Sequence, residues 1–409
     1  MRVLFTPHVA AQHLYPLVPL AWAFRAAGHE VRIAASPGLA DAIVHTGLAG
    51  AIVGADPPAP TSADDATVAL VYGHQPFPAD WPLHPHLLDD RQRETIEVLG
   101  RRSAVAAEHL VDDLIAYAAG WPPDLVVHDI GSFAGPVTAA ALGVPSVRHL
   151  TGVGLRPMDT RVDGVEPLPE YAALFERRGL EVRVPTLSID PSPPSLRLPV
   201  AQPWREVRYV PYNGPGTEPA WLAAGSDRPR VCVTWGLSVS RVRKDLARYA
   251  VEPFLLTLEA LAELRAEVIV TSTAAQLELL GPLPGNVRAV TGLPLNLLLP
   301  HCQLIVHQAG DGTAMTASAL GVPQLPVTRK PDPALTGSRL AAVGAAIHLR
   351  YQELEGAPDA PKVIRAAAEE LLTDPAYRQA ALRLRAEVER QPAPAELVPV
   401  LERLSRGSG

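Results

Sequence analysis

Residues 3–34 read VLFTPHVAAQHLYPLVPLAWAFRAAGHEVRIA and contain the pattern that decides the fold. Short apolar segments open and close this stretch, with a loop at 6–15 and helical spacing over 16–27 between them. Proline is favoured in the first turn of a helix, where Pro16 stands, and glycine just past its end, where Gly28 stands. This strand–loop–helix–strand order predicts a parallel sheet covered by helices.

The same alternation of short apolar strands and helical segments continues along the chain, with one interruption. Residues 185–221 are rich in proline and contain NGPG at 213–216, so we interpret them as an interdomain linker. The pattern predicts an α/β protein with two Rossmann-like domains whose parallel sheets face each other across a cleft. Ligands of such sheets bind at the carboxyl ends of the strands. Further strands are predicted at 125–128, 144–148, 231–235, 268–271 and 304–307.

Composition excludes several classes of protein. The 409 residues are 47% hydrophobic and 19% charged, which indicates a folded chain with a large core and not a disordered one. A net charge of −7 provides no basic surface for nucleic acid or an anionic membrane. Cys232 and Cys302 are too few for a disulfide framework and favour a reducing cytoplasm. Neither a signal peptide nor a membrane-spanning apolar run is visible, so we expect a cytoplasmic protein.

The loop at 6–15 is the first candidate site because it follows a strand. It lacks the glycines of a dinucleotide-binding turn, which excludes the usual dehydrogenase fingerprint. His13 lies three residues before Pro16, at the expected start of a helix. The helix dipole there favours the neutral imidazole, the form that a general base requires. A surface or capping histidine is the alternative interpretation.

Asp129 is the second candidate, at the carboxyl end of the apolar strand LVVH. A carboxylate at this place can orient an imidazole and stabilise the imidazolium as it forms. The alternative is an N-cap for the helix predicted at 132–142, since aspartate is a preferred capping residue.

The third candidate is HQAGDGT at 307–313, between a strand and an alanine-rich helix. Glycines at such a turn allow backbone N–H groups to face an anion, and the helix dipole favours negative charge. The turn lacks the lysine of a P-loop, so ATP hydrolysis is not indicated. A turn without any binding role is the alternative.

Residues 55–90 differ from the rest of the chain. They hold many prolines, several histidines, Phe77 and Trp81, and show no clear periodicity. A loop of this length in a compact domain is usually functional or mobile.

Ordered motifs across nearly the whole chain resemble the GT-B nucleotide-sugar glycosyltransferases. The resemblance is to the bacterial group that attaches deoxysugars to macrolides and aromatic polyketides, which includes the desosaminyltransferase of erythromycin biosynthesis. The motifs are PLVPLAWA at 16–23, AAGHEV at 26–31, PDLVV at 123–127, PSVRHL at 145–150, YNGP at 212–215, LLPH at 298–301, the turn at 307–313 and GVPQ at 321–324.

The resemblance implies roles for individual residues. His13 would be the base that activates the acceptor, and Asp129 its carboxylate partner. Phe77, Trp81 and Phe133 would line an apolar acceptor pocket. The implied donor-binding residues, which hold the diphosphate, the nucleobase or the sugar hydroxyls, are Gly236, Leu237, Ser238, Leu293, Gln308, Ala309, Gly310, Asp311, Gly312, Thr313 and Asp332.

The implied reaction is an inverting transfer of a deoxysugar from a nucleoside diphosphate, expected to be TDP, to an apolar natural product in antibiotic biosynthesis. The nucleotide sugar is a co-substrate, and no other cofactor is expected. No D-x-D metal signature is present, so we expect no metal. Some relatives depend on an activator protein, so that partner or a homodimer is allowed. We assign 1–212 to acceptor binding, 213–375 to donor binding, and 376–409 to helices that return toward the N-terminal domain.

Three positions depart from the family pattern. Gln308 replaces the second histidine of the usual His-His-Gly-Gly, Gly292 replaces a tryptophan that stacks on the nucleobase, and Pro333 replaces the glutamine after Asp332. The departures leave two alternatives: a non-catalytic homologue that acts as a binding partner, or a nucleotide-sugar 2-epimerase on the same fold.

Overall fold

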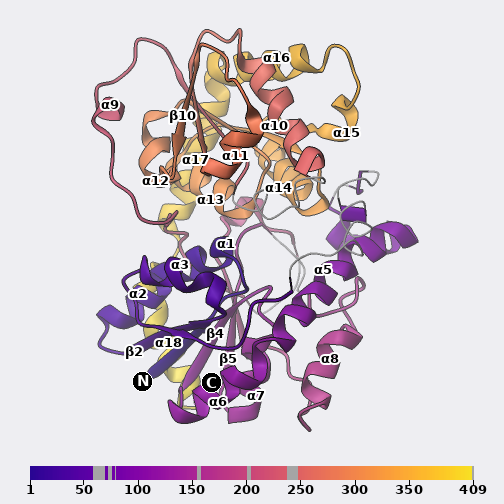
Figure 1. Ribbon diagram of the computed structural model, residues 1–409, viewed down its shortest axis with the longest axis vertical. Helices are drawn as coiled ribbons and strands as arrows, with labels where there is room; N and C mark the ends of the chain where they lie inside the picture. The colour runs from indigo at the N-terminus through magenta and orange to yellow at the C-terminus, as the bar shows by residue number, and fades with distance from the viewer. Residues whose placement is uncertain are drawn as a thin grey trace.

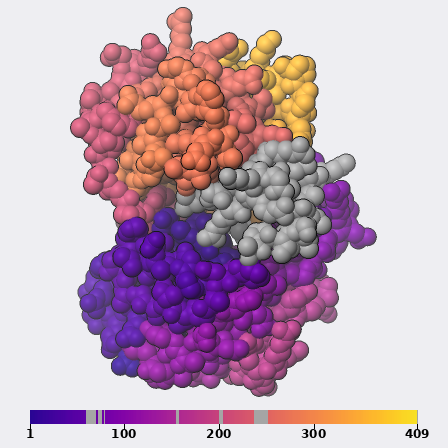
Figure 2. Space-filling model, in the orientation of Figure 1, coloured from indigo at the N-terminus to yellow at the C-terminus, as the bar shows by residue number. Residues whose placement is uncertain are grey.

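The computed structural model describes residues 1–58, 70–71, 76–78, 80–153, 158–199, 204–236 and 247–407. In this part of the chain the strands form two sheets, each in a lobe of its own, and the lobes are stacked end to end (Figure 1). Figure 2 shows an indigo-to-magenta lobe below a lobe that runs from orange to yellow. The prediction of two α/β domains with parallel sheets is confirmed.

The N-terminal sheet has the order β3-β2-β1-β4-β5-β6-β7, with every pair parallel. Its strands are β1 Arg2–Thr6, β2 Glu30–Ala35, β3 Gly50–Ile52, β4 Leu125–Asp129, β5 Ser146–His149, β6 Leu187–Asp190 and β7 Trp204–Glu206. Its helices are α1 Ala11–Leu14, η1 Tyr15–Leu17, α2 Val18–Ala26, η2 Pro37–Leu39, α3 Ala40–Val44, η3 Trp81–Leu83, η4 Pro85–Leu87, α5 Asp90–Glu108, α6 Val111–Gly120, α7 Ala134–Leu142, α8 Pro169–Glu176 and η5 Pro194–Leu196.

The C-terminal sheet has the order β10-β9-β8-β11-β12-β13 and is also parallel. Its strands are β8 Arg230–Thr234, β9 Glu267–Ser272, β10 Val287–Thr291, β11 Leu304–His307, β12 Gln324–Thr328 and β13 Leu349–Arg350. The helices of this half are α9 Ala220–Ala223, α10 Ala247–Leu261, α11 Ala274–Leu280, α12 Leu295–Leu298, η7 Leu299–His301, α13 Asp311–Leu320, α14 Pro331–Ala342, α15 Tyr351–Leu354, α16 Ala360–Thr373, α17 Pro375–Arg390 and α18 Pro394–Ser405.

Strand β1 is buried on both faces, as a central strand of a parallel sheet should be. Val3 and Phe5 pack with α2 on one face, and Leu4 packs with α6 and α7 on the other. Because side chains alternate across a strand, the short apolar run supplies both cores at once. The carboxyl ends of β1 and β4 are thereby fixed side by side, where Thr6 pairs with His128.

The helical segment that follows β1 begins earlier than the sequence pattern predicted. It starts at Ala11 and not at Pro16, because α1, η1 and α2 follow one another without a break. Pro16 stands in the first turn of η1, where a proline is tolerated because the N–H it lacks would have no helical partner. His13 therefore lies inside the first helical turn and not ahead of it.

The two final helices connect the lobes. Helix α17 packs on α13 of the C-terminal lobe, and α18 packs on α2 of the N-terminal lobe, where it is drawn in yellow beside the first strands (Figure 1). Leu397, Val398 and Leu401 of α18 are part of the core that contains Val3 and Phe5. No helix among the described residues has the length and apolar character needed to cross a membrane.

Candidate active site

Asp129 is the last residue of β4, and its side chain is fully buried. Its Oδ1 accepts a hydrogen bond from the backbone N–H of His8 at 2.6 Å, and its Oδ2 accepts one from that of Gly131 at 3.0 Å. Helix α7 begins only at Ala134, with Phe133 at the N-cap position and no side-chain cap. Asp129 therefore does not cap this helix.

His13 reaches Asp129 from the first helical turn. The distance from His13 Nδ1 to Asp129 Oδ2 is 2.6 Å, and the histidine side chain remains 23% exposed. An ionised carboxylate only accepts hydrogen bonds, so the contact places the imidazole proton on Nδ1 and leaves the lone pair on Nε2. Burial alone would raise the pKa of Asp129, but the charge and hydrogen bond of His13, the charge of His8 and the Gly131 N–H together lower it.

The glycine-rich turn begins at His307, the buried last residue of β11. Ala309 N–H donates to His307 Nδ1 at 3.0 Å, so Nε2 carries the proton and donates to Gln324 Oε1 at 3.0 Å. Burial lowers the pKa of His307 to about 4, which keeps the ring neutral. Ala309 adopts a φ of +62°, a left-handed conformation that is rare for residues other than glycine. Gly310 then takes the N-cap position of α13.

Asp311, Gly312 and Thr313 form the first turn of α13. The N–H of Thr313 donates to the carbonyl of Gly310 at 3.0 Å, whereas the N–H groups of Asp311 and Gly312 are among those that an α-helix leaves without a partner inside it. Gln308 lies just before them, and its Oε1 is buried with no hydrogen-bond partner among the described residues. A Cβ at Gly236 would come within 2.7 Å of Gln308 Nε2, so the turn after β8 touches the glycine-rich turn. Leu237 and Ser238, also predicted to bind the donor, lie outside the described residues.

The side chain of Asp311, in the C-terminal lobe, forms a hydrogen bond with the N-terminal lobe. Thr151 Oγ1, two residues beyond β5, donates to Asp311 Oδ2 at 2.8 Å. Burial raises the pKa of Asp311, although Thr151, His13 and Lys330 oppose the shift. Thr151 follows β5, whose His149 pairs with Asp129 of β4, so the first turn of α13 lies beside the sheet edge that carries the His13–Asp129 pair.

Asp332 stands in the first turn of α14, followed by Pro333. Burial raises the pKa of Asp332 to about 6; the charge of Lys330 opposes this shift, and that of Asp311 adds to it. The carboxylates of Asp311 and Asp332 therefore lie in the same part of the site. Asp332 is thus on the same edge of the C-terminal sheet as the glycine-rich turn.

The predicted nucleobase region lies after β10. The carbonyl of Leu293 accepts a hydrogen bond from Thr271 Oγ1 at 3.0 Å, which fixes the backbone there. Gly292 has a φ of +66°, and a Cβ at this residue would find no atom within 4 Å. The space for a larger residue is therefore open, but its side chain would be strained by the left-handed backbone.

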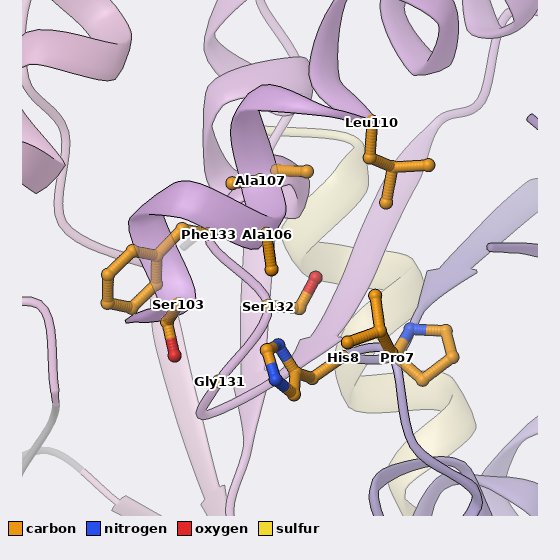
Figure 3. Close-up of a pocket in the computed structure, with 11 residues that line it drawn as sticks. Pro7, His8, Ser103, Ala106, Ala107, Leu110, Gly131, Ser132 and Phe133 are labelled. Carbon is orange, nitrogen blue, oxygen red and sulfur yellow. The ribbon is translucent and has the colours of Figure 1, made fainter. Parts of the chain in front are cut away.

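A small pocket in the N-terminal lobe contains one of the three predicted acceptor residues. Phe133 lines it together with His8 and with Ser103 and Ala106 of α5 (Figure 3). Phe77 and Trp81 do not line this pocket. They pack edge to face on each other with ring centroids 5.5 Å apart, are 6% and 2% exposed, and form a separate apolar cluster. Their contact with an acceptor stays a prediction.

His8 and Thr151 belong to the site but were not singled out from the sequence. Both lie two residues beyond the end of a strand, β1 and β5 respectively. The rule that ligands bind where parallel strands end could have found them. Among the described residues, no group of three or more His, Cys, Asp or Glu side chains is arranged to hold a metal ion.

Comparisons with known proteins match both halves of the chain. The model for the erythromycin biosynthesis protein CIII-like N-terminal domain matches residues 22–236, and that for the corresponding C-terminal domain matches 255–404. Tylactone mycaminosyltransferase of Streptomyces fradiae is 36% identical over 438 residues, covering 99% of this chain and 92% of the relative.

Solved structures show the same similarity. The glycosyltransferase VinC in complex with dTDP has a TM-score of 0.79 and 32% identity, with all of both chains covered. Spinosyn rhamnosyltransferase SpnG in complex with spinosyn aglycone has a TM-score of 0.79 and 30% identity, covering 98% of this chain and 100% of that one. The predictions of the GT-B fold and of a glycosyltransferase are confirmed. The chain belongs to the erythromycin biosynthesis protein CIII-like family of GT-B glycosyltransferases.

Proposed function

We propose that this enzyme transfers a deoxysugar from TDP to a hydroxyl group of an apolar polyketide-type acceptor, with inversion at the anomeric carbon, in antibiotic biosynthesis. One observation carries the proposal: the His13–Asp129 pair, at 2.6 Å, lies near the first turn of α13. Asp311 of that turn accepts a hydrogen bond from Thr151 of the N-terminal lobe. The relatives support the substrates, since VinC is bound to dTDP and SpnG to an aglycone.

The imidazole of His13 is placed to take a proton from the acceptor. Nδ1–H is held by Asp129, so Nε2 is the basic atom, and the histidine side chain is 23% exposed. The acceptor oxygen attacks the anomeric carbon as its proton moves to Nε2, and the bond from that carbon to the diphosphate oxygen breaks. The buried carboxylate of Asp129 stabilises the imidazolium through this step.

The first turn of α13 would receive the departing diphosphate. The backbone N–H groups of Asp311 and Gly312 and the positive end of the helix dipole favour negative charge there. The neutral amide of Gln308 can add one hydrogen bond but no charge. Asp332, at the start of α14, would accept hydrogen bonds from sugar hydroxyl groups.

The test separates nucleotide binding from transfer. Calorimetry should detect TDP binding, and mass spectrometry should detect a glycosylated product when TDP-sugars are offered with macrolactone and hydroxylated aromatic acceptors. His13→Gln should keep TDP binding and lose product. A folded wild-type protein that binds no TDP, or a His13→Gln variant with wild-type turnover, would contradict the proposal.

A further inference from the structure

Asn213 lies in the linker, and its carboxamide contacts two segments of the C-terminal half at once. Its Oδ1 accepts a hydrogen bond at 3.1 Å from the backbone N–H of Asn296, in α12. Its Nδ2 donates to Thr316 Oγ1, in α13, at 3.1 Å. Helix α12 follows the predicted nucleobase region at Leu293, and α13 begins with the glycine-rich turn. One carboxamide therefore connects the segment predicted to bind the nucleobase with the segment predicted to bind the diphosphate.

Thr316 connects Asn213 to the first turn of α13. The threonine is fully buried, and its Oγ1 donates to the carbonyl of Gly312 at 2.6 Å. The same carbonyl accepts a hydrogen bond from Tyr209 Oη, also in the linker, at 3.2 Å. Glycine has the greatest backbone freedom of any residue. The bonds to the carbonyl of Gly312 therefore restrict the residue whose N–H would face the diphosphate.

The linker is also held by the N-terminal lobe on both sides of Asn213. Tyr212 Oη donates to the carbonyl of His45 at 3.1 Å, and the Tyr212 ring packs edge to face on that of Tyr15, with centroids 5.4 Å apart. Gly214 has a φ of +92°, and a Cβ at this residue would lie 3.1 Å from Tyr15 Oη. These contacts fix the backbone that carries Asn213, so its carboxamide has a defined position between α12 and α13.

We propose that Asn213 is a positioning residue for the donor, which fixes the first turn of α13 relative to α12 so that diphosphate and nucleobase are bound together. The inference rests on the proposed function, because it assumes that these two segments bind TDP. Asn213 would act through Thr316 and Gly312 and not by contact with the nucleotide. Without these hydrogen bonds TDP must order the turn as it binds, and that cost lowers its affinity.

Variants at Thr316 test this connection with little change of shape. Thr316→Val replaces the hydroxyl by a methyl group, and calorimetry should show a TDP affinity about tenfold lower, the value of one hydrogen bond. Thr316→Ser keeps the hydroxyl, and its affinity should stay close to that of the wild type. Asn213→Ala should also weaken TDP binding. In Asn213→Ala/Thr316→Val the loss should be smaller than the product of the two single losses, because the two side chains act through one another.

Thr257→Val is the matched control in the same half of the chain. Thr257 of α10 is fully buried, and its Oγ1 donates to the carbonyl four residues earlier, that of Pro253, at 2.7 Å. The change removes the same kind of hydrogen bond, so thermal unfolding should show a similar loss of stability, but TDP affinity should be unchanged.

Three outcomes would overturn the proposal: a wild-type TDP affinity in Thr316→Val, a loss in Thr316→Ser as large as that in Thr316→Val, or an equal loss in Thr257→Val. Single losses that multiply fully in the double variant would also overturn it, since Asn213 would then not act through Thr316. Failure of the proposed function has another signature, a folded wild-type protein that binds no TDP, and this inference would fall with it.

Discussion

His13 and Asp129 are separated by 116 residues in the sequence, yet their side chains meet at 2.6 Å. They meet because β1 and β4 are neighbours in the sheet and both end at the same edge. Two backbone N–H groups hold the carboxylate of Asp129, so its position does not depend on the histidine alone. The sheet and the two backbone N–H groups therefore fix the position of the carboxylate that His13 contacts.

Removal of the His13 imidazole tests directly whether this residue is the general base. His13→Ala should lower turnover by roughly 10²–10⁴, the usual contribution of general base catalysis. TDP affinity should change by no more than a few-fold, because the imidazole lies on the N-terminal side of the site. Steady-state kinetics and calorimetry measure the two quantities separately.

Asp129→Asn is the companion change. Its amide cannot stabilise the imidazolium as a carboxylate does, so the rate should fall by more than the affinity. The backbone contacts of residue 129 limit structural damage, which thermal unfolding can verify. A variant that loses TDP affinity in proportion to its rate would show that Asp129 organises the whole site and has no special relation to His13.

Gln308→His tests the departure in the donor turn. The buried Oε1 of Gln308 has no partner among the described residues, and Nε2 lies against the backbone of Gly236 and Gly310. An imidazolium forms hydrogen bonds to phosphate roughly twice as strong as those of a neutral amide. TDP affinity should rise, and more at pH 6 than at pH 8, because the ordinary pKa of histidine is about 6.5. Calorimetry showing equal affinities at both values of pH would refute this role.

At the element scale, α13 presents its first turn to the site with room for the ligand. Gly310 is the N-cap, and Gly312 has no atom closer to an added Cβ than Tyr209 Oη at 3.9 Å. The backbone of Gly312 is not left-handed, so it does not need glycine for its own conformation. A side chain at this position would therefore extend into space that the described residues leave open.

Gly312→Val follows from this geometry. The side chain fits the folded protein, so the unfolding temperature should stay near that of the wild type. It fills the space before the N–H groups, so TDP affinity should fall at least tenfold. Gly120→Val, at the end of α6 where nothing lies within 4 Å of an added Cβ, is the control and should bind TDP normally. Wild-type TDP affinity in Gly312→Val would remove this turn from the donor site.

The elements were predictable where the physical rule is local. Short apolar runs between helical segments gave the strands, and the ends of parallel strands gave His13, Asp129 and the turn at 307–313 as candidates. The early start of the helical segment at Ala11 was not visible, because a proline at position 16 is compatible with either start. Contacts between distant segments, such as Thr151 with Asp311, follow from lobe packing, which no local pattern encodes.

At the scale of the whole molecule, the lobes are joined by a packed interface as well as by the chain. Val153, Leu196 and Tyr209 share an apolar cluster with residues of α13, α14 and α17. Tyr209 Oη also donates to the carbonyl of Gly312 at 3.2 Å, and Asn213 Nδ2 donates to Thr316 Oγ1 at 3.1 Å. The proline-rich composition predicted a linker, but not the hydrogen bonds of its C-terminal part to α13.

Buried histidines at the strand ends predict how the stability of the whole molecule depends on pH. Burial lowers the pKa of His128, His149 and His307 to about 4, against about 6.5 in an unfolded chain. As pH falls from 6.5 to 4, the unfolded state binds protons that the folded state does not bind, so each buried histidine lowers the free energy of unfolding as the pH falls. Asp332, with its pKa raised to about 6, opposes this trend because the folded state binds its proton first.

Urea unfolding at pH 7.5, 6.5, 5.5 and 4.5 measures the net slope of the free energy of unfolding against pH. This slope should be smaller in His149→Leu and unchanged in His301→Gln. A slope that is the same in His149→Leu as in the wild type would contradict a buried, neutral imidazole at this position.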